Sequence, residues 1–213
     1  MDNNPKYYWR IKEMKKLIGS LIILLGFNSI AFADTDPSDY LKGVANKMIS
    51  VIEQNKEALK TDSKLAENLV RTHLLPIIDK EAFSRGTLGK KTWKTLSDEQ
   101  KELFKNGYIS RVINKYAKGL SLYDGQAFVF QKAEISKRTG NARVKSAMKQ
   151  SDSEPLDIHY HLTKKSGNWL ITNIIVAGTD MRKSYKNQFK PRIKEIGMDK
   201  FIEELNAPPK AKN

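Results

Sequence analysis

The amino-acid sequence predicts a single α+β domain, with helices in its first part and an antiparallel sheet in its second. Apolar residues recur at steps of three and four as far as about residue 122, which is the spacing of helix faces. From Gln126 they recur at every second residue, which is the spacing of half-buried strands. In Asn168–Phe189 a strand that is apolar on both faces leads into a helix, so we expect this stretch to lie at the centre of the fold.

The first 33 residues have the form of a secretory signal peptide. Lys15 and Lys16 precede an apolar run at residues 17–27, and Ala31-Phe32-Ala33 supplies a small-x-small cleavage site. We therefore expect the protein to be exported and the segment to be removed.

Two further features of this segment bear on its processing. Asn28 and Ser29 leave the apolar run shorter than the roughly 20 residues of a membrane-spanning helix, which favours cleavage over an uncleaved anchor. Met14 is a second candidate for the translation start, because the residues before it are polar and add nothing to a signal. The expected organisation is a signal peptide at 1–33, one domain at 34–205 and a disordered tail at 206–213.

The composition narrows the range of partners. The chain of 213 residues carries 38 Lys and Arg against 24 Asp and Glu and has no cysteine. An exported domain without cysteine has no disulfide and depends on its hydrophobic core. A basic surface outside the cytoplasm favours anionic lipid head groups, acidic partner proteins or polyanionic glycans over nucleic acid. The excess of lysine also fits a surface that is simply solubilised by charge.

The part of the chain before the sheet contains several helices. Apolar faces predict helices over about 38–59 and 63–73, and Pro76 ends the second one. Asp79 begins another short turn, and the glycines within 85–89 predict a loop.

The strongest helix signal begins at Ser97, which forms a capping box with Gln100. A row of apolar residues at strict four-residue spacing follows and predicts one elongated apolar surface: Phe104, Tyr108, Val112, Tyr116 and Leu120. Tyr123-Asp124-Gly125 ends this helix.

The second part of the chain predicts a four-stranded antiparallel meander. The expected strands are Gln126–Ile135, Ala142–Gln150, Leu156–Lys164 and Trp169–Ala177, with hairpin turns between them. Thr179 or Asp180 can then cap a helix that runs to Ile196, and a short helix is expected at Met198–Leu205.

The sequence contains few residues that suggest catalysis or metal binding. Asp157, His159 and His161 share one strand face and could chelate a metal, but a solvated outer face explains the same pattern. His73 is better explained as a helix-end histidine than as a general base. The loop that begins at Leu88-Gly89 is only a weak match to a phosphate-binding loop. No metal, cofactor or catalytic residue is therefore expected.

The apolar residues of the long helix can instead face the sheet. Tyr108, Val112 and Tyr116 would then lie opposite a set of strand residues: Val144, Met148, Ile158, Tyr160 and Leu162. Such a set can form a solid core or line a cavity, and periodicity alone does not distinguish the two.

Four stretches in order resemble the toluene-tolerance (Ttg2D/MlaC-type) family of periplasmic phospholipid-binding, ABC-transporter auxiliary proteins. The stretches are Leu74-Leu75-Pro76-Ile77-Ile78-Asp79, Leu88-Gly89 with Trp93, Ser97-Asp98-Glu99-Gln100-Lys101 with Phe104, and Trp169 through Gly178 to Phe189. The resemblance covers about residues 40–205. This chain departs from the family pattern at Asn173, where the family has an acidic residue, and at Ala177-Gly178-Thr179-Asp180.

The resemblance implies an NTF2-like fold, a curved sheet wrapped by helices around an apolar cavity that holds acyl chains. It implies a periplasmic carrier without catalysis, which shuttles phospholipid between an outer-membrane lipoprotein complex and an inner-membrane ABC transporter complex with its substrate-binding ring. Such shuttling maintains the lipid asymmetry of the outer membrane. An NTF2-like enzyme with a small-molecule pocket and a basic structural adaptor with a solid core are the alternatives.

A lipid cavity adds two strand residues to the candidate site. A tail cavity tolerates the hydroxyl of Thr172 better than the amide of Asn173, so the face with Ile174 and Val176 is expected to point inward. The candidate lipid-binding residues are Tyr108, Val112, Tyr116, Val144, Met148, Ile158, Tyr160, Leu162, Ile174 and Val176. The candidates for head-group or docking contacts are Lys90, Lys91, Arg182, Lys183 and Lys186.

Overall fold

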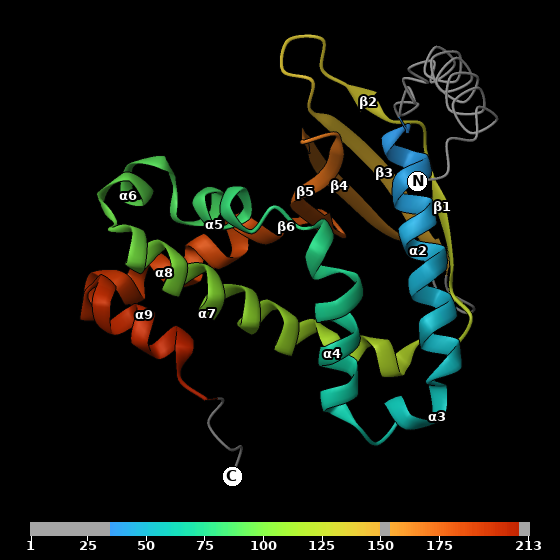
Figure 1. Cartoon of the computed structure of the whole chain (residues 1–213), viewed down its shortest axis with the longest axis horizontal. Helices are drawn as coiled ribbons and strands as arrows, with labels where there is room; N and C mark the ends of the chain where they lie inside the picture. Colours follow the sequence, from blue (N-terminus) through green and yellow to red (C-terminus); the bar gives the residue numbers. More distant parts are fainter. Residues whose placement is uncertain (1–34, 150–153, 209–213) are drawn as a thin grey trace, which may run out of the picture. The chain divides into compact units, whose positions relative to one another are not determined.

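The computed structural model describes residues 35–149 and 154–208 (Figure 1). The expected signal peptide and residues 209–213 of the expected tail lie outside the described residues. Within the described ranges, no helix combines the length and apolar character needed to cross a membrane. Helices come first, a sheet follows and two helices close the described chain, which confirms the α+β architecture.

Between the long helices α2 (Pro37–Gln54) and α7 (Asp98–Tyr116) the helices before the sheet are short, and polar side chains cap three of the helices in this part of the chain. Asp36, Asp62 and Asp79 each accept a hydrogen bond from a backbone N–H in the first turn of the helix that follows. The expected loop at 85–89 is wrong, because the helix extends to Leu88 and Gly89 alone turns the chain, at φ 85°. These elements are α2 (Pro37–Gln54), α3 (Lys56–Leu59), α4 (Ser63–His73), η1 (Leu75–Ile77), α5 (Lys80–Leu88) and α6 (Lys90–Thr95).

The long helix α7 (Asp98–Tyr116) begins at the expected capping box. Ser97 Oγ accepts a hydrogen bond from the Gln100 N–H at 3.1 Å, and Gln100 Oε1 accepts one from the Ser97 N–H at 2.9 Å. After Tyr116 the chain tightens into a 3₁₀ helix, η2 (Ala117–Leu122).

The prediction of four strands is wrong, because the sheet of the described residues has six strands. The last three expected strands correspond to its three long strands, whereas the first is divided into two short strands and another short strand is added after the last. The path is β1–β3–β4–β5–β6, and β2 also pairs with β3. The strands are β1 (Ala127–Phe130), β2 (Glu134–Ile135), β3 (Ala142–Lys149), β4 (Leu156–Lys165), β5 (Asn168–Val176) and β6 (Thr179–Asp180).

The break between β1 and β2 lies at Gln131, whose two backbone groups bond to different elements. Its backbone N–H still donates to the Lys145 carbonyl, at 2.8 Å. Its carbonyl, however, accepts a hydrogen bond from Ser38 Oγ of α2, also at 2.8 Å. The break in the strand thus ties the start of α2 to the sheet, and α2 runs beside β1 and β3 (Figure 1).

Two helices follow the sheet, α8 (Met181–Ile196) and α9 (Met198–Asn206). Asp180 caps α8 by accepting a hydrogen bond from the Lys183 N–H at 2.9 Å, which agrees with one of the two expected caps. The buried Asn173 amide donates to the other carboxylate oxygen of Asp180, at 2.7 Å. Asn173 and Asp180, two of the positions that depart from the family pattern, are therefore in direct contact.

The buried apolar residues form two clusters. The helical core is centred on α5, α7, α8 and α9, also includes residues of α2, α3, α4 and α6, and contains tilted and edge-on aromatic rings: Phe83, Phe104, Tyr108, Tyr185, Phe189 and Phe201. The sheet core contains Leu41, Ala142, Val144, Leu162, Trp169 and Ile171. Between these clusters the side chains leave a cavity.

Candidate functional site

A cavity of about 760 Å³ lies between the sheet and the helices α2, α4 and α7. Its lining residues are almost all aliphatic or aromatic, and none of them is an Asp, Glu, Lys, Arg or His. The cavity rules out a uniformly solid core, which was one of the alternatives that the sequence left open. It is suited to an apolar ligand, because no charged group has to be desolvated when the ligand enters.

The sheet contributes one face of β1, β3, β4 and β5. Ile158 pairs with Val176 and Tyr160 pairs with Ile174, so these four side chains share the face that lines the cavity. Phe128 of β1 and Met148 of β3 are likewise paired and continue this wall.

A β-bulge in β5 changes which residues face the cavity. Leu162 of β4 pairs with Ile171, whereas His161, its neighbour, pairs with Asn173, so Thr172 is the extra residue. Ile171 before the bulge and Ile174 after it both line the cavity. The expectation of strict alternation along β5 is therefore wrong, because the bulge shifts the period by one residue.

Helix α7 contributes both to the wall of the cavity and to the helical core. Its cavity wall consists of Ile109, Val112, Ile113 and Tyr116. A residue four positions along an α-helix is rotated about 40° further around the axis. The row that begins at Phe104 therefore starts in the helical core and reaches the cavity only at Val112.

The N-terminal helices form most of the remaining wall, to which Phe83 of α5 and Met181 of α8 also contribute. Helix α2 contributes six residues, and the segment from α4 to η1 contributes five: Leu41, Val44, Ala45, Met48, Ile49 and Ile52, then Val70, Leu74, Leu75, Ile77 and Ile78. The sequence shows the apolar face of α2, but nothing in its spacing distinguishes a face that lines a cavity from one that packs on a core.

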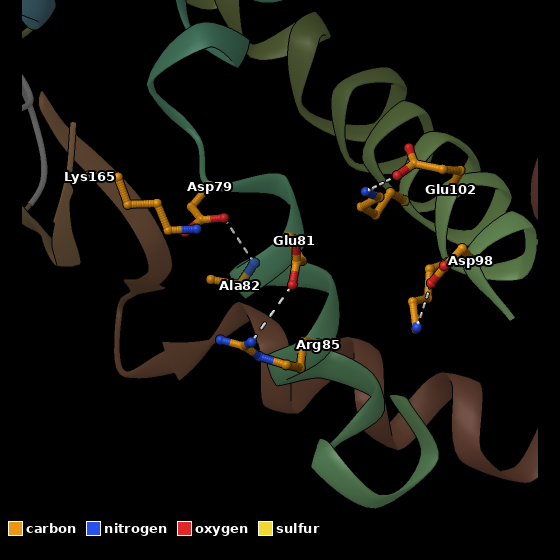
Figure 2. Close-up of polar contacts among 9 residues, drawn as sticks. Asp79, Glu81, Ala82, Arg85, Asp98, Glu102 and Lys165 are labelled. Atoms are coloured by element: carbon orange, nitrogen blue, oxygen red, sulfur yellow. Dashed lines mark hydrogen bonds and ion pairs between the residues drawn. The ribbon is translucent and has the colours of Figure 1, made fainter. Parts of the chain in front are cut away.

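Asp79 connects the part of the cavity wall formed by η1 to the sheet (Figure 2). Its backbone N–H donates to the Ile171 carbonyl at 2.9 Å, and its side chain accepts a hydrogen bond from the Ala82 N–H at 3.0 Å. Lys165 of β4 lies 2.7 Å from the second carboxylate oxygen. Asp79 is buried, and these contacts position the cavity wall beside β5.

The cavity opens to solvent along η2. Among its lining residues, only Tyr116, Gly119 and Leu122 are exposed, and all three lie at the end of α7 or in η2. Leu122 keeps 76% of its surface exposed and Tyr116 keeps 48%. This segment therefore forms the mouth of the cavity.

The structure brings seven of the ten candidate residues together on the cavity wall: Val112, Tyr116, Met148, Ile158, Tyr160, Ile174 and Val176. It places the other three in the packed cores. Tyr108 lies in the helical core, where its hydroxyl hydrogen-bonds with that of Thr87 at 3.0 Å, and burial raises its pKa. Val144 and Leu162 lie in the sheet core. Lipid contact by each of the ten stays a prediction.

Polar groups are sparse within the cavity. Gln126 and the hydroxyls of Tyr116, Tyr123 and Tyr160 are the polar side-chain groups on its wall. Burial raises the pKa of Tyr160, so its hydroxyl stays protonated at physiological pH. The wall therefore remains uncharged over the physiological range.

The histidines lie outside the cavity. His161 is half-buried on the opposite face of the sheet, and burial together with the nearby Arg143 lowers its pKa. Among the described residues, no group of three or more His, Asp or Glu side chains could hold a metal ion. Of the five candidate cations, Lys90, Lys91, Lys183 and Lys186 are exposed, and none of the five lines the cavity. The fifth, Arg182, is half-buried against Gly86.

These features define an α+β protein with an uncharged apolar binding cavity. The family model described as MlaC protein matches residues 42–207, and the chain therefore belongs to the MlaC family. This membership confirms the resemblance seen in the sequence.

Two curated relatives match over most of their length. The chain is 24% identical over 183 residues to the toluene tolerance protein ttg2D of Pseudomonas putida, covering 85% of this chain and 84% of that protein. It is 27% identical over 182 residues to the intermembrane phospholipid transport system binding protein MlaC of Haemophilus influenzae, covering 82% and 83%.

A solved structure shares the fold. It is the phospholipid-binding protein from Ralstonia solanacearum in complex with a phospholipid, with a TM-score of 0.70 and 20% sequence identity. The match covers 81% of this chain and all of that chain.

Proposed function

We propose that this protein is a periplasmic carrier that binds a phospholipid, with the acyl chains inside the cavity and the head group at the mouth. The observation that carries the proposal is the wall of the cavity, which is apolar and uncharged, and whose exposed members among the described residues all lie at the end of α7 or in η2. Membership of the MlaC family and the phospholipid held by the structural relative support it.

The size of the cavity suits acyl chains. A volume of about 760 Å³ holds about 25 methylene groups, if each takes roughly the 30 Å³ of a liquid water molecule. At about 0.8 kcal/mol per methylene, keeping these methylene groups out of water lowers the free energy by on the order of 20 kcal/mol. A free phospholipid has to pay that cost to leave a bilayer, whereas a bound one does not.

Lipid binding by the cavity does not by itself determine the direction of transport. A lipid leaves one apolar environment for another when it moves from a bilayer into the cavity, so the two states are close in free energy. The carrier alone therefore sets no direction. We infer that partners do so: an outer-membrane lipoprotein complex and an inner-membrane ABC transporter complex with its substrate-binding ring. Transfer between them would maintain outer-membrane lipid asymmetry.

The remaining parts of the proposal concern fold type and chemistry. We assign the arrangement of a sheet and helices around a cavity to the NTF2-like type. The carrier needs no cofactor and performs no catalysis, since holding and releasing a lipid requires only burial and exposure of its chains. The periplasmic location is supported by the form of the N-terminal 33 residues.

Native mass spectrometry of the purified protein tests the proposal. We expect adducts with the mass of a phospholipid, which disappear on delipidation and return after incubation with liposomes. A protein that carries no such adduct and takes up no phospholipid from liposomes would overturn the assignment.

A further inference from the structure

A second hollow, of about 810 Å³, lies between α7, α8 and α9. We call it the α7–α9 groove. On α7 it is lined by Gly107, Ser110, Arg111, Asn114 and Lys115, and no residue lines both this groove and the lipid cavity. At 100° per residue these positions lie on the face of α7 opposite Ile109, Val112 and Ile113. The groove is therefore a separate site.

The groove contains cations that no acidic side chain neutralises. Arg192 is paired with Glu204 and Glu195, so its charge is compensated. Arg111 donates a hydrogen bond to the Glu204 backbone carbonyl, which carries no full charge. The Lys115 ammonium lies over the rings of Tyr116 and Tyr185. Neither Arg111 nor Lys115 pairs with a carboxylate in the part of the chain that the structure describes, so the groove has a net positive potential.

Tyr185 adds a hydroxyl without a hydrogen-bond partner. Only 5% of the residue is exposed, and its Oη has no partner among the described residues. The Lys115 ammonium lies 5.7 Å from the centre of its ring. Burial raises the pKa of Tyr185 to about 12, so the hydroxyl keeps its proton. A buried donor left unsatisfied costs free energy unless a ligand completes it.

We infer that the α7–α9 groove binds a short acidic peptide segment of a partner protein, with a carboxylate held by Tyr185, Lys115 and Arg111. The flexible Lys115 side chain moves from the tyrosine ring toward the carboxylate and thereby opens the hydroxyl to it. Three donors around one carboxylate form charge-assisted hydrogen bonds, which are stronger than neutral ones.

The length of the groove favours a peptide over a single anion. Its α7 side runs from Gly107 to Lys115, about 12 Å at 1.5 Å per residue. An extended peptide rises about 3.3 Å per residue, so three to four residues fit along it. A free phosphate would leave most of the groove filled with water. The cavity mouth at η2 does not share a lining residue with the groove, although Lys115 Nζ lies 5.3 Å from the centre of the Tyr116 ring at that mouth.

Fluorescence anisotropy with labelled hexaglutamate and hexaglutamine peptides tests the inference. We expect the full protein to bind hexaglutamate at low salt and to bind hexaglutamine at least tenfold more weakly. Y185F should weaken hexaglutamate binding at least tenfold, because a hydrogen bond to a charged group is lost. K115Q, at an exposed side chain, should weaken binding severalfold. The control K118Q, one turn along and outside the groove, should change it less than twofold.

Each arm has an outcome that overturns the inference. Equal binding of hexaglutamine would remove the requirement for acid, and unchanged binding by Y185F would remove the tyrosine from the site. An equal loss in K118Q and K115Q would show diffuse attraction to a basic surface. Complete displacement of the peptide by millimolar inorganic phosphate would show a site for a single anion.

Two further readouts separate this inference from folding and from lipid binding. Y185F should melt at the same or a higher temperature than the unaltered protein, because its hydroxyl has no partner to lose. Its phospholipid content by native mass spectrometry should be unchanged, since the groove and the cavity share no lining residue. A failure of peptide binding therefore leaves the lipid proposal standing, and the reverse also holds.

Discussion

Ile158 offers a direct test of the lipid cavity. Its side chain lines the cavity from β4, is half-buried and belongs to neither packed core. In the I158D variant the new carboxylate can be hydrated while the cavity is empty, so we expect the fold to survive. Acyl chains in the cavity would remove that water and surround the charge with apolar groups.

The free-energy cost of lipid binding to I158D follows from the pKa of the introduced carboxyl. A lipid-filled cavity raises this pKa, so the penalty is full above the raised value and disappears below the unperturbed value of about 3.9. If the group must be protonated before the lipid enters, the cost at pH 7.5 is at most about 5 kcal/mol, at 1.36 kcal/mol per pH unit. At pH 5.0 the same calculation leaves about 1.5 kcal/mol.

I158N is the matched control because asparagine has the same shape as aspartate and does not titrate. The assay is the partition of a fluorescent phospholipid between vesicles and purified protein at both pH values. I158N should bind lipid more weakly than the unaltered protein, by the cost of burying an amide, about 1–3 kcal/mol, with little dependence on pH. I158D should bind much more weakly at pH 7.5 and should approach I158N at pH 5.0.

Two results would refute the reasoning. Equal partition into I158D and I158N at pH 7.5 would show that lipid does not surround this position. A defect of I158D that is unchanged at pH 5.0 would point to a structural cause, which circular dichroism and thermal melting would then reveal.

Three further predictions concern residues that cap or pack the helices, and each is tested by the free energy of unfolding in urea. D79A should lower the free energy of unfolding by about 1–3 kcal/mol, because α5 loses its cap and the side-chain contact with Lys165 is lost, while the backbone bond to Ile171 remains. K165Q, at a half-exposed partner, should cost under about 1 kcal/mol, and an equal loss in both would contradict this ranking. Y108F should cost about 1 kcal/mol through the lost hydrogen bond with Thr87 and leave lipid uptake unchanged, whereas reduced uptake at unchanged stability would return Tyr108 to the cavity. S97A should cost about 1 kcal/mol through the capping box, and no loss would show that the cap is replaced by water.

If the cavity binds lipid as proposed, the mouth would allow a lipid to enter without unfolding of the protein. Its lining residues Tyr116, Gly119 and Leu122 all belong to the end of α7 or to η2, while the other walls are buried or half-buried. An apolar side chain as exposed as Leu122 offers a first apolar contact to an entering acyl chain.

The elements that depend on neighbouring residues could be predicted from the sequence. The capping box at Ser97, the cap at Asp180 and the alternating pattern of the long strands all involve residues within a few positions of each other. The order of helices and strands follows from such signals. The division of the first strand at Gln131 does not, because its cause is a hydrogen bond from Ser38, 93 residues away.

The composition of the candidate site depended on the tertiary structure. Tyr108 and Tyr116 belong to one apolar row, yet the first is buried in the helical core and the second is exposed at the cavity mouth. Ile171 and Ile174 differ in strand parity, yet the bulge at Thr172 brings both to the cavity. The sequence by itself determined which residues are apolar and in which elements they lie, because those properties are local. Only the packing of distant elements decided which apolar residues meet each other and which surround a space.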